Sequence, residues 1–250
     1  MERTPGLTGA HVRLEPLEHR HIDGLAAASA GDAELYQWSP VPQGREQATA
    51  YVETALAWRD AGTAVPFAIV RTVDGAVIGS TRFFNLERWA WPEGHERHRR
   101  QMFPPFAKNA EDGAPERYGQ RSSDPLLAKE ARSGAPQILS EAPQILPDAC
   151  EIGYSWLARS AIRTAANTEA KLLMLTRAFE DWQALRVCFH TDARNERSRA
   201  ALERIGAKFE GVLRSHRMAA DFIARDSWRY SIVAAEWPEV KLKLSGMLAR

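Results

Sequence analysis

The hydrophobic positions of the first 85 residues follow two spacings. Alternation of apolar and polar residues predicts a strand over residues 11–17, and β-rich composition predicts strands over 65–72 and 76–85. A spacing of three and four predicts helices over residues 19–30 and 45–60. The dipeptide Asp74-Gly75 between the last two strands is a strong hairpin signal. This part of the chain is therefore predicted to run strand, helix, helix, hairpin.

The residues after 149 show the same two spacings in a different order. Strands are predicted over residues 150–157, 185–191, 207–214 and 225–233, helices over 168–182 and 195–205, and a polar loop over 215–224. In the first of these strands Ile152, Tyr154 and Trp156 are expected to share a face. A strand, helix, strand step must cross over between parallel strands, because such a helix cannot fit in a hairpin. We predict an α+β fold, with a mixed, mainly antiparallel sheet, one parallel strand pair and flanking helices.

Residues 88–148 differ in composition from both parts. They hold eight of the fourteen prolines, two dense basic runs and a short duplication at 135–139 and 142–146. Two copies of a five-residue unit are too few for a repeat fold. We predict a single domain over 1–250, with 88–148 as an irregular, Pro-rich insertion between the third and fourth predicted strands. A functional lid or an oligomerisation arm is the alternative for so long a loop.

Composition narrows the class of protein. The 33 Lys and Arg residues against 32 Asp and Glu give a net charge of +1, which provides no long-range attraction to nucleic acid or acidic membranes. Cys150 and Cys188 lie in apolar runs and are expected to be buried, reduced thiols. The N-terminus lacks a signal-peptide pattern, and no apolar run is long enough to cross a bilayer. We expect a cytoplasmic protein without nucleic-acid or membrane partners, and the histidine spacing predicts no metal site.

Two strand-to-helix junctions contain the residues best suited to bind a ligand. The first, residues 156–170, is rich in small residues, and Asn167 or Thr168 is expected to cap its helix. Free N–H groups at such a helix start bind phosphate well, and Arg163 would add charge. The second, residues 191–198, follows the parallel strand, so both junctions are expected at one cleft. The alternative is that Asn195 and Ser198 only cap and pack their helix.

Taken together, these segments resemble the GNAT superfamily of acyl-CoA N-acyltransferases, in the branch that contains the ribosomal-protein N-terminal acetyltransferases. The predicted element order, apart from the insertion, agrees with that fold. The resemblance implies acetyl-CoA, or another acyl-CoA, as co-substrate, and a splayed strand pair at 150–157 and 185–191 that admits the pantetheine arm. The matching segments are 151–154, 167–173, 186–187, 191–198, 205–207, 210–214, 230–232 and 236–238.

The resemblance also implies which residues bind the co-substrate. The pantetheine amides would pair with the backbone of the 151–157 strand, and the pyrophosphate would bind residues 162–168. Many members have glycines where this chain has Arg163 and Ala165, a departure for which the charge of Arg163 could compensate. The full predicted set is Tyr154, Trp156, Leu157, Ile162, Arg163, Thr164, Ala165, Ala166, Asn167, Thr168, Asn195 and Ser198.

Catalysis in such an enzyme needs a base, an oxyanion donor and an acid. Glu151 is the candidate general base, with a surface carboxylate as the alternative. A backbone N–H near 154–156 is the candidate oxyanion donor. Many members use a tyrosine as the acid, but this chain has Leu202 at that position. Ser198, or a water held by Asn195, is the predicted substitute.

The acceptor groove is expected between the 31–44 connection and the 215–224 loop. Tyr36, Trp38 and Asp221 are the predicted substrate-binding residues, and Asp32 and Glu34 could help to attract a cationic amine. The predicted function is acyl transfer, most simply of acetyl, to the primary amine of a protein N-terminus or a small molecule. A bulkier donor such as succinyl-CoA and a non-catalytic acyl-CoA sensor are the alternatives. A homodimer is left open.

Overall fold

The computed structural model describes residues 5–90, 146–219 and 221–249. Most of the predicted insertion therefore lies outside the described residues. The described strands form one mixed sheet of eight in the order β1-β2-β3-β4-β5-β6-β8-β7, in which only β5 and β6 are parallel neighbours. The strands are β1 (Leu7–Thr8), β2 (Val12–Pro16), β3 (Ala64–Arg71), β4 (Val77–Glu87), β5 (Ala149–Leu157), β6 (Arg186–Asp192), β7 (Lys208–Met218) and β8 (Ala224–Val233). The predicted fold class and the parallel pair are confirmed.

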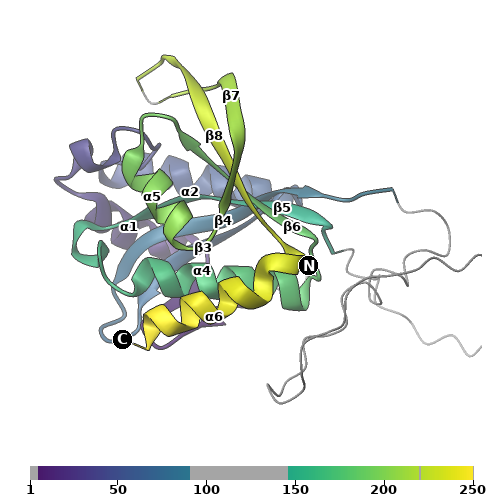
Figure 1. The fold of residues 1–250 in the computed structure, drawn as a ribbon. Helices are drawn as coiled ribbons and strands as arrows, with labels where there is room; N and C mark the ends of the chain where they lie inside the picture. The colour runs from purple at the N-terminus through teal and green to yellow at the C-terminus, as the bar shows by residue number, and fades with distance from the viewer. Residues whose placement is uncertain (1–4, 91–145, 220, 250) are drawn as a thin grey trace, which may run out of the picture.

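Helices cover both faces of this sheet. Figure 1 shows α1 and α2 on one side of the strands and α4 and α6 on the other, with the β7–β8 hairpin projecting past α5. The bounds are α1 (Ile22–Ser29), α2 (Gly44–Asp60), α4 (Ala166–Thr176), α5 (Glu196–Arg204) and α6 (Trp237–Leu248). Short 3-10 helices occupy His19–His21, Ala33–Tyr36, Arg159–Ala161 and Ala234–Glu236, and α4 continues as a π-helical turn over Arg177–Asp181.

Two apolar clusters, one on each face, hold these layers together. The larger lies beneath α4 and α6 and includes Phe83 and Trp237, both fully buried. The smaller lies beneath α1 and α2 and includes Val52 and Trp156. Because the central strands are covered on both faces, some of their polar residues, such as Thr81 and Arg82 on β4, are buried as well.

A bulge interrupts β5 in the middle of the sheet. Tyr154 has a φ of 50°, and the register of β5 against β4 shifts beside it. Ile152 therefore belongs to the cluster under α4, whereas Trp156 belongs to the cluster under α2. The prediction that Ile152, Tyr154 and Trp156 share a face is wrong, because the extra residue reverses the alternation.

Local features of several elements also differ from the prediction. The N-cap of α4 is Ala165, and the backbone N–H of Ala166 donates to Thr164 Oγ1 at 3.2 Å, so neither Asn167 nor Thr168 caps that helix. The helix α6 and the two-residue strand β1 were not predicted. The strand β7 extends four residues further than expected, to Met218, so the loop after it is shorter.

Candidate functional site

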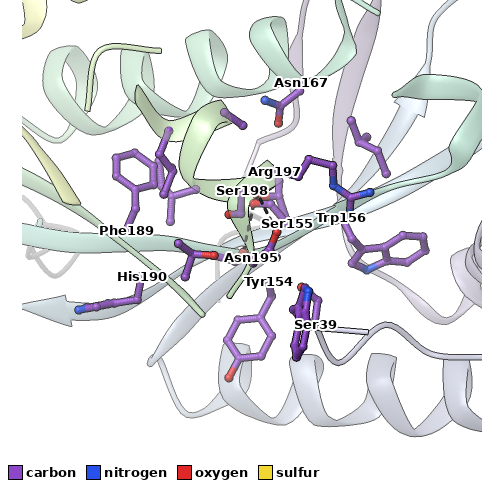
Figure 2. A pocket seen from close by; sticks show the side chains of 18 of the residues that line it. Ser39, Tyr154, Ser155, Trp156, Asn167, Phe189, His190, Asn195, Arg197 and Ser198 are labelled. Carbon is purple, nitrogen blue, oxygen red and sulfur yellow. Dashed lines mark hydrogen bonds between the residues drawn. The ribbon is translucent and has the colours of Figure 1, made fainter. Parts of the chain in front are cut away.

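The parallel strands β5 and β6 separate after a short paired stretch. The last residues in register are Glu151 and Cys188, although both strands continue beyond them. A cavity of about 770 Å³ lies at this separation and reaches α4 and α5. Figure 2 shows Ser155, Asn195 and Ser198 close together at its centre, with Asn167 on the side of α4. The splayed strand pair expected from the resemblance is therefore present.

Most residues predicted to bind the co-substrate line this cavity. Ala166 and Thr168 are instead buried in α4, and Thr168 Oγ1 accepts a hydrogen bond of 3.0 Å from Arg204. Ala165 is also absent from the lining. The residues that do line it are Tyr154, Trp156, Leu157, Ile162, Arg163, Thr164, Asn167, Asn195 and Ser198.

The loop before α4 adopts a conformation suited to close ligand approach. Arg163 has a φ of 61°, the left-handed region that glycine enters most easily. Arg163, where many family members have glycine, therefore adopts a conformation open to glycine and adds a guanidinium at the cavity wall. Positive charge also extends along the rest of the cavity. Its charged lining among the described residues is Arg163, Lys171, Arg197, Arg204, Arg217 and Arg225 against the single carboxylate Glu151.

The start of α5 forms the second predicted junction. Asn195 is its N-cap, and its Oδ1 accepts a 3.0 Å hydrogen bond from the backbone N–H of Ser198. The capping role weighed for Asn195 is therefore confirmed. The Ser198 side chain lies toward Ser155 across the cavity (Figure 2), and Leu202 lines the same wall.

Glu151 lines the cavity and is buried rather than on the surface. Its Oε1 lies 2.8 Å from His190 Nδ1, and both side chains are less than a tenth exposed. Its Oε2 accepts a 3.0 Å hydrogen bond from Asn85 Nδ2, and Arg217 Nη2 lies 4.0 Å away. The alternative of a surface carboxylate is wrong. The cavity lining therefore includes a buried carboxylate beside an imidazole.

Lys171 contributes a buried amine that the sequence analysis missed. It lies on the face of α4 that packs on the sheet, and its Nζ donates a 2.7 Å hydrogen bond to Ser155 Oγ. Ser155 Oγ in turn lies 2.6 Å from Thr81 Oγ1. Burial lowers the pKa of Lys171 to about 7, with no opposing charge to offset it. The amine therefore exchanges its proton near neutral pH.

This burial leads to a stability prediction for Lys171→Met. Below pH 7 the folded protein must hold a buried ammonium, whereas the unfolded chain holds it in water with a pKa near 10.5. Between these values the unfolded state binds more protons, so wild-type stability rises with pH. We expect the variant to be about 3–5 kcal/mol more stable than wild type at pH 6, since each pKa unit is worth about 1.4 kcal/mol. That advantage should shrink toward zero by pH 10.

Urea unfolding at pH 6 and pH 10 measures this difference. Lys243→Met, at an exposed position on α6, is the matched control and should show no such pH dependence. A Lys171→Met advantage that is equal at the two pH values would contradict a lowered pKa.

Two predicted acceptor residues lie at the cavity. Tyr36 is buried, donates its hydroxyl to the carbonyl oxygen of Leu157 at 3.0 Å, and packs edge-on against Trp156 with ring centroids 5.8 Å apart. Trp38 lines the cavity beneath the guanidinium of Arg194, whose Cζ lies 4.1 Å from its ring centroid. These aromatic side chains define the wall formed by the 31–44 connection.

The acidic residues expected to attract a cationic amine do not line the cavity. Asp221 pairs with Arg194 at 2.8 Å, which holds the pKa of that carboxyl below its usual value. Asp32 pairs with Arg159 at 2.6 Å, and Glu34 is also outside the lining. This placement gives no support to attraction of a cationic amine by these groups.

No group of three or more His, Cys, Asp or Glu side chains within the described ranges is arranged to hold a metal ion. Of the helices in those ranges, none combines the length and apolar character needed to span a bilayer. Cys150 and Cys188 are buried free thiols, as expected.

Comparison with known proteins places these features in context. A family model described as an acetyltransferase (GNAT) domain matches residues 11–99 and 132–208. No curated protein matches the chain. A crystal structure from T. thermophilus, described as an acetyltransferase, is 29% identical, with a TM-score of 0.66, over 99% of this chain and 100% of that chain.

Two more distant structures share the fold. A GCN5-related N-acetyltransferase from Brucella melitensis is 21% identical, with a TM-score of 0.67, over 98% of this chain and 85% of that chain. Mycobacterium smegmatis RimJ in complex with CoA-disulfide is 19% identical, with a TM-score of 0.63, over 98% of this chain and 93% of that chain.

Proposed function

The chain belongs to the GNAT acetyltransferase family, and on that premise we propose that it transfers an acetyl group from acetyl-CoA to a primary amine. The observation that supports this best is the cavity between the separated strands β5 and β6. A thioester arm can enter there and pair with backbone groups of β5 that β6 leaves free. Both reactants are then held together, which supplies a large share of the barrier reduction.

The donor is proposed to lie along the wall formed by α4 and α5. The pyrophosphate would bind at the 162–165 loop, where Arg163 and the positive end of the α4 dipole favour an anion. Arg197 and Arg204 line the same side and suit further phosphate groups. The basic lining of the cavity fits a polyanionic co-substrate.

Glu151 is proposed as the general base. In this step the amine nitrogen attacks the thioester carbonyl carbon, the carbon–sulfur bond breaks, and the amine proton passes to the Glu151 carboxylate, directly or through a water. His190 Nδ1, 2.8 Å from Glu151 Oε1, is proposed as a second site for the proton. A backbone N–H at 154–156 would stabilise the oxyanion.

Two groups are proposed to return a proton to the departing thiolate. Ser198, the substitute predicted from sequence, lines the cavity opposite Ser155. Lys171 is favoured by its pKa of about 7, because an ammonium of that acidity releases a proton readily at neutral pH. Its hydrogen bond to Ser155 provides a path to the cavity.

Initial-rate kinetics test this proposal. The full chain is mixed with acetyl-CoA and a panel of amines and peptides, and release of the CoA thiol is followed. Direct attack in a ternary complex predicts intersecting lines when both substrates are varied. Parallel lines would indicate an acetyl-enzyme intermediate and contradict direct attack.

A further inference from the structure

Arg82, in the middle of β4, is a buried cation with no charged partner among the described residues. The residue is 1% exposed, and neither its Nε nor its Nη2 makes a hydrogen bond. A buried ion without compensation costs several kcal/mol, and buried N–H groups are almost always paired. The proposed catalytic steps do not use this side chain. Its surroundings therefore need another explanation.

Three aromatic rings enclose the Arg82 guanidinium. Its Cζ lies 4.8 Å from the ring centroid of Tyr51, 5.3 Å from that of Trp58 and 4.3 Å from that of Tyr154. Cation–π attraction compensates part of the desolvation cost. It does not pair the in-plane Nε and Nη2 donors, which together form the edge that binds a carboxylate with two parallel hydrogen bonds.

A second cavity of about 490 Å³ opens beside this guanidinium. It lies between α2 and the sheet, and Arg82 is the charged residue in its lining. Tyr154, Pro40 and Val41 line both this cavity and the larger one, so the two are neighbours across the β5 bulge. Figure 2 shows the Tyr154 ring pointing away from Asn167 and the donor side.

Positive charge also lies on the other side of Tyr154. The Arg217 guanidinium is 5.8 Å from the ring centroid of Phe84, and that ring is 5.2 Å from the ring of Tyr154. Arg225, which is half-buried, lines the larger cavity nearby. Glu151 is the one carboxylate that lines either cavity within the described chain. This environment repels a diamine or polyamine and attracts an anion.

Resting on the proposed function, we infer that the acceptor is an amine that also carries a carboxylate. Arg82 binds the carboxylate from the cavity beside α2, while the amine lies at Glu151 on the other side of Tyr154. The arginines select against acceptors with a second cation, and the aromatic rings cover the linker between the two groups. A free amino acid and a peptide with an acidic group near its N-terminus share this chemistry.

Matched acceptors test the inference. The value of kcat/KM is measured at saturating acetyl-CoA for ω-amino acids of increasing length, for alkylamines of the same lengths, and for the corresponding diamines. We expect a preference of about tenfold or more for the carboxylate at the best length, the effect of one charge-assisted bidentate pair. Arg82→Gln should bring this ratio close to one. A further set of acceptors, peptides with aspartate or asparagine at the second position, tests the peptide alternative. A preference for aspartate in this set would favour a peptide acceptor over a free amino acid.

Control variants separate a specific effect of Arg82 from misfolding and from a general loss of activity. Arg45→Gln removes an exposed arginine that pairs with Asp23, and it should keep the wild-type ratio. If Arg82→Gln does not fold, Arg82→Lys keeps the charge without the two-donor edge and should still lower the ratio. Equal rates for carboxylate and uncharged acceptors, or an unchanged ratio in the folded variants, would overturn the inference. If no amine is turned over, the proposed function fails instead. The anion site can then still be tested by thermal unfolding with glutarate. A shift in the wild type that is absent in Arg82→Lys would support the site.

Discussion

Glu151→Gln is expected to lower kcat by about 100-fold to 1,000-fold, within the usual range for loss of a general base. The amide keeps the size of the side chain and can still bond Asn85, but it cannot take the proton of the attacking amine. Because Glu151 lies on β5 and not in the 162–165 loop proposed to bind the pyrophosphate, the affinity for CoA should change little. Thiol-release kinetics and calorimetric titration with CoA measure the two effects separately.

A matched control for this variant is Glu53→Gln, at an exposed position on α2. It should leave both kcat and CoA affinity at wild-type values. Turnover by Glu151→Gln at the wild-type rate would remove the carboxylate from the mechanism. Loss of CoA binding together with turnover would instead show that Glu151 maintains the structure of the cavity.

Glu169→Ala should produce the largest loss of stability, about 3 kcal/mol or more. The buried Glu169 carboxylate accepts three backbone N–H bonds, from Ala10 at 2.8 Å and from His11 and Val12 at 2.7 Å each. Alanine leaves these donors without their partner next to α4, and each unpaired buried donor costs about 1–3 kcal/mol. The bonds join the start of β2 to the first turn of α4, so the 162–165 loop before α4 should also become more mobile.

Urea unfolding at pH 7 measures this effect. Glu196→Ala, at the exposed first turn of α5, removes a carboxylate with an 86% exposed side chain and is expected to cost less than about 1 kcal/mol. An equally small cost for Glu169→Ala would mean that water replaces the carboxylate without loss, and that the contact does not hold β2 in place.

The strands and helices around the site could be predicted because their apolar spacing reflects which faces are buried. The same reasoning could not detect the β5 bulge, since Ile152, Tyr154 and Trp156 alternate with smaller residues as in a regular strand. The reversal of faces depends on the backbone of Tyr154, with its φ of 50°, and on pairing with β4. The helix α6 did leave a signal that was not used, because Pro238 lies in its first turn, a common helix start.

The cavity lining could be predicted only where the position of a residue follows from the order of strands and helices. The junctions at 162–167 and 195–198 reach the cavity because strand ends and helix starts place them there. His190, Lys171 and Arg82 were missed because their roles come from neighbours that are distant in sequence. A lysine among the apolar positions of a helix, as at Lys171, was the one usable signal. The prediction that Asp221 binds the acceptor rested on its charge alone, and the sequence does not show that Arg194 is its partner.

Acetyl transfer at the cavity between β5 and β6 is tested most directly by mass spectrometry of the acceptor amine, together with the amount of CoA thiol released. With acetyl-CoA and a carboxylate-bearing amine, wild-type protein should yield one acetylated amine for each thiol, and Glu151→Gln should slow both equally. Binding of acetyl-CoA with no acetylated product from any amine or peptide in the panel would contradict this. That result is what a non-catalytic acyl-CoA sensor would give.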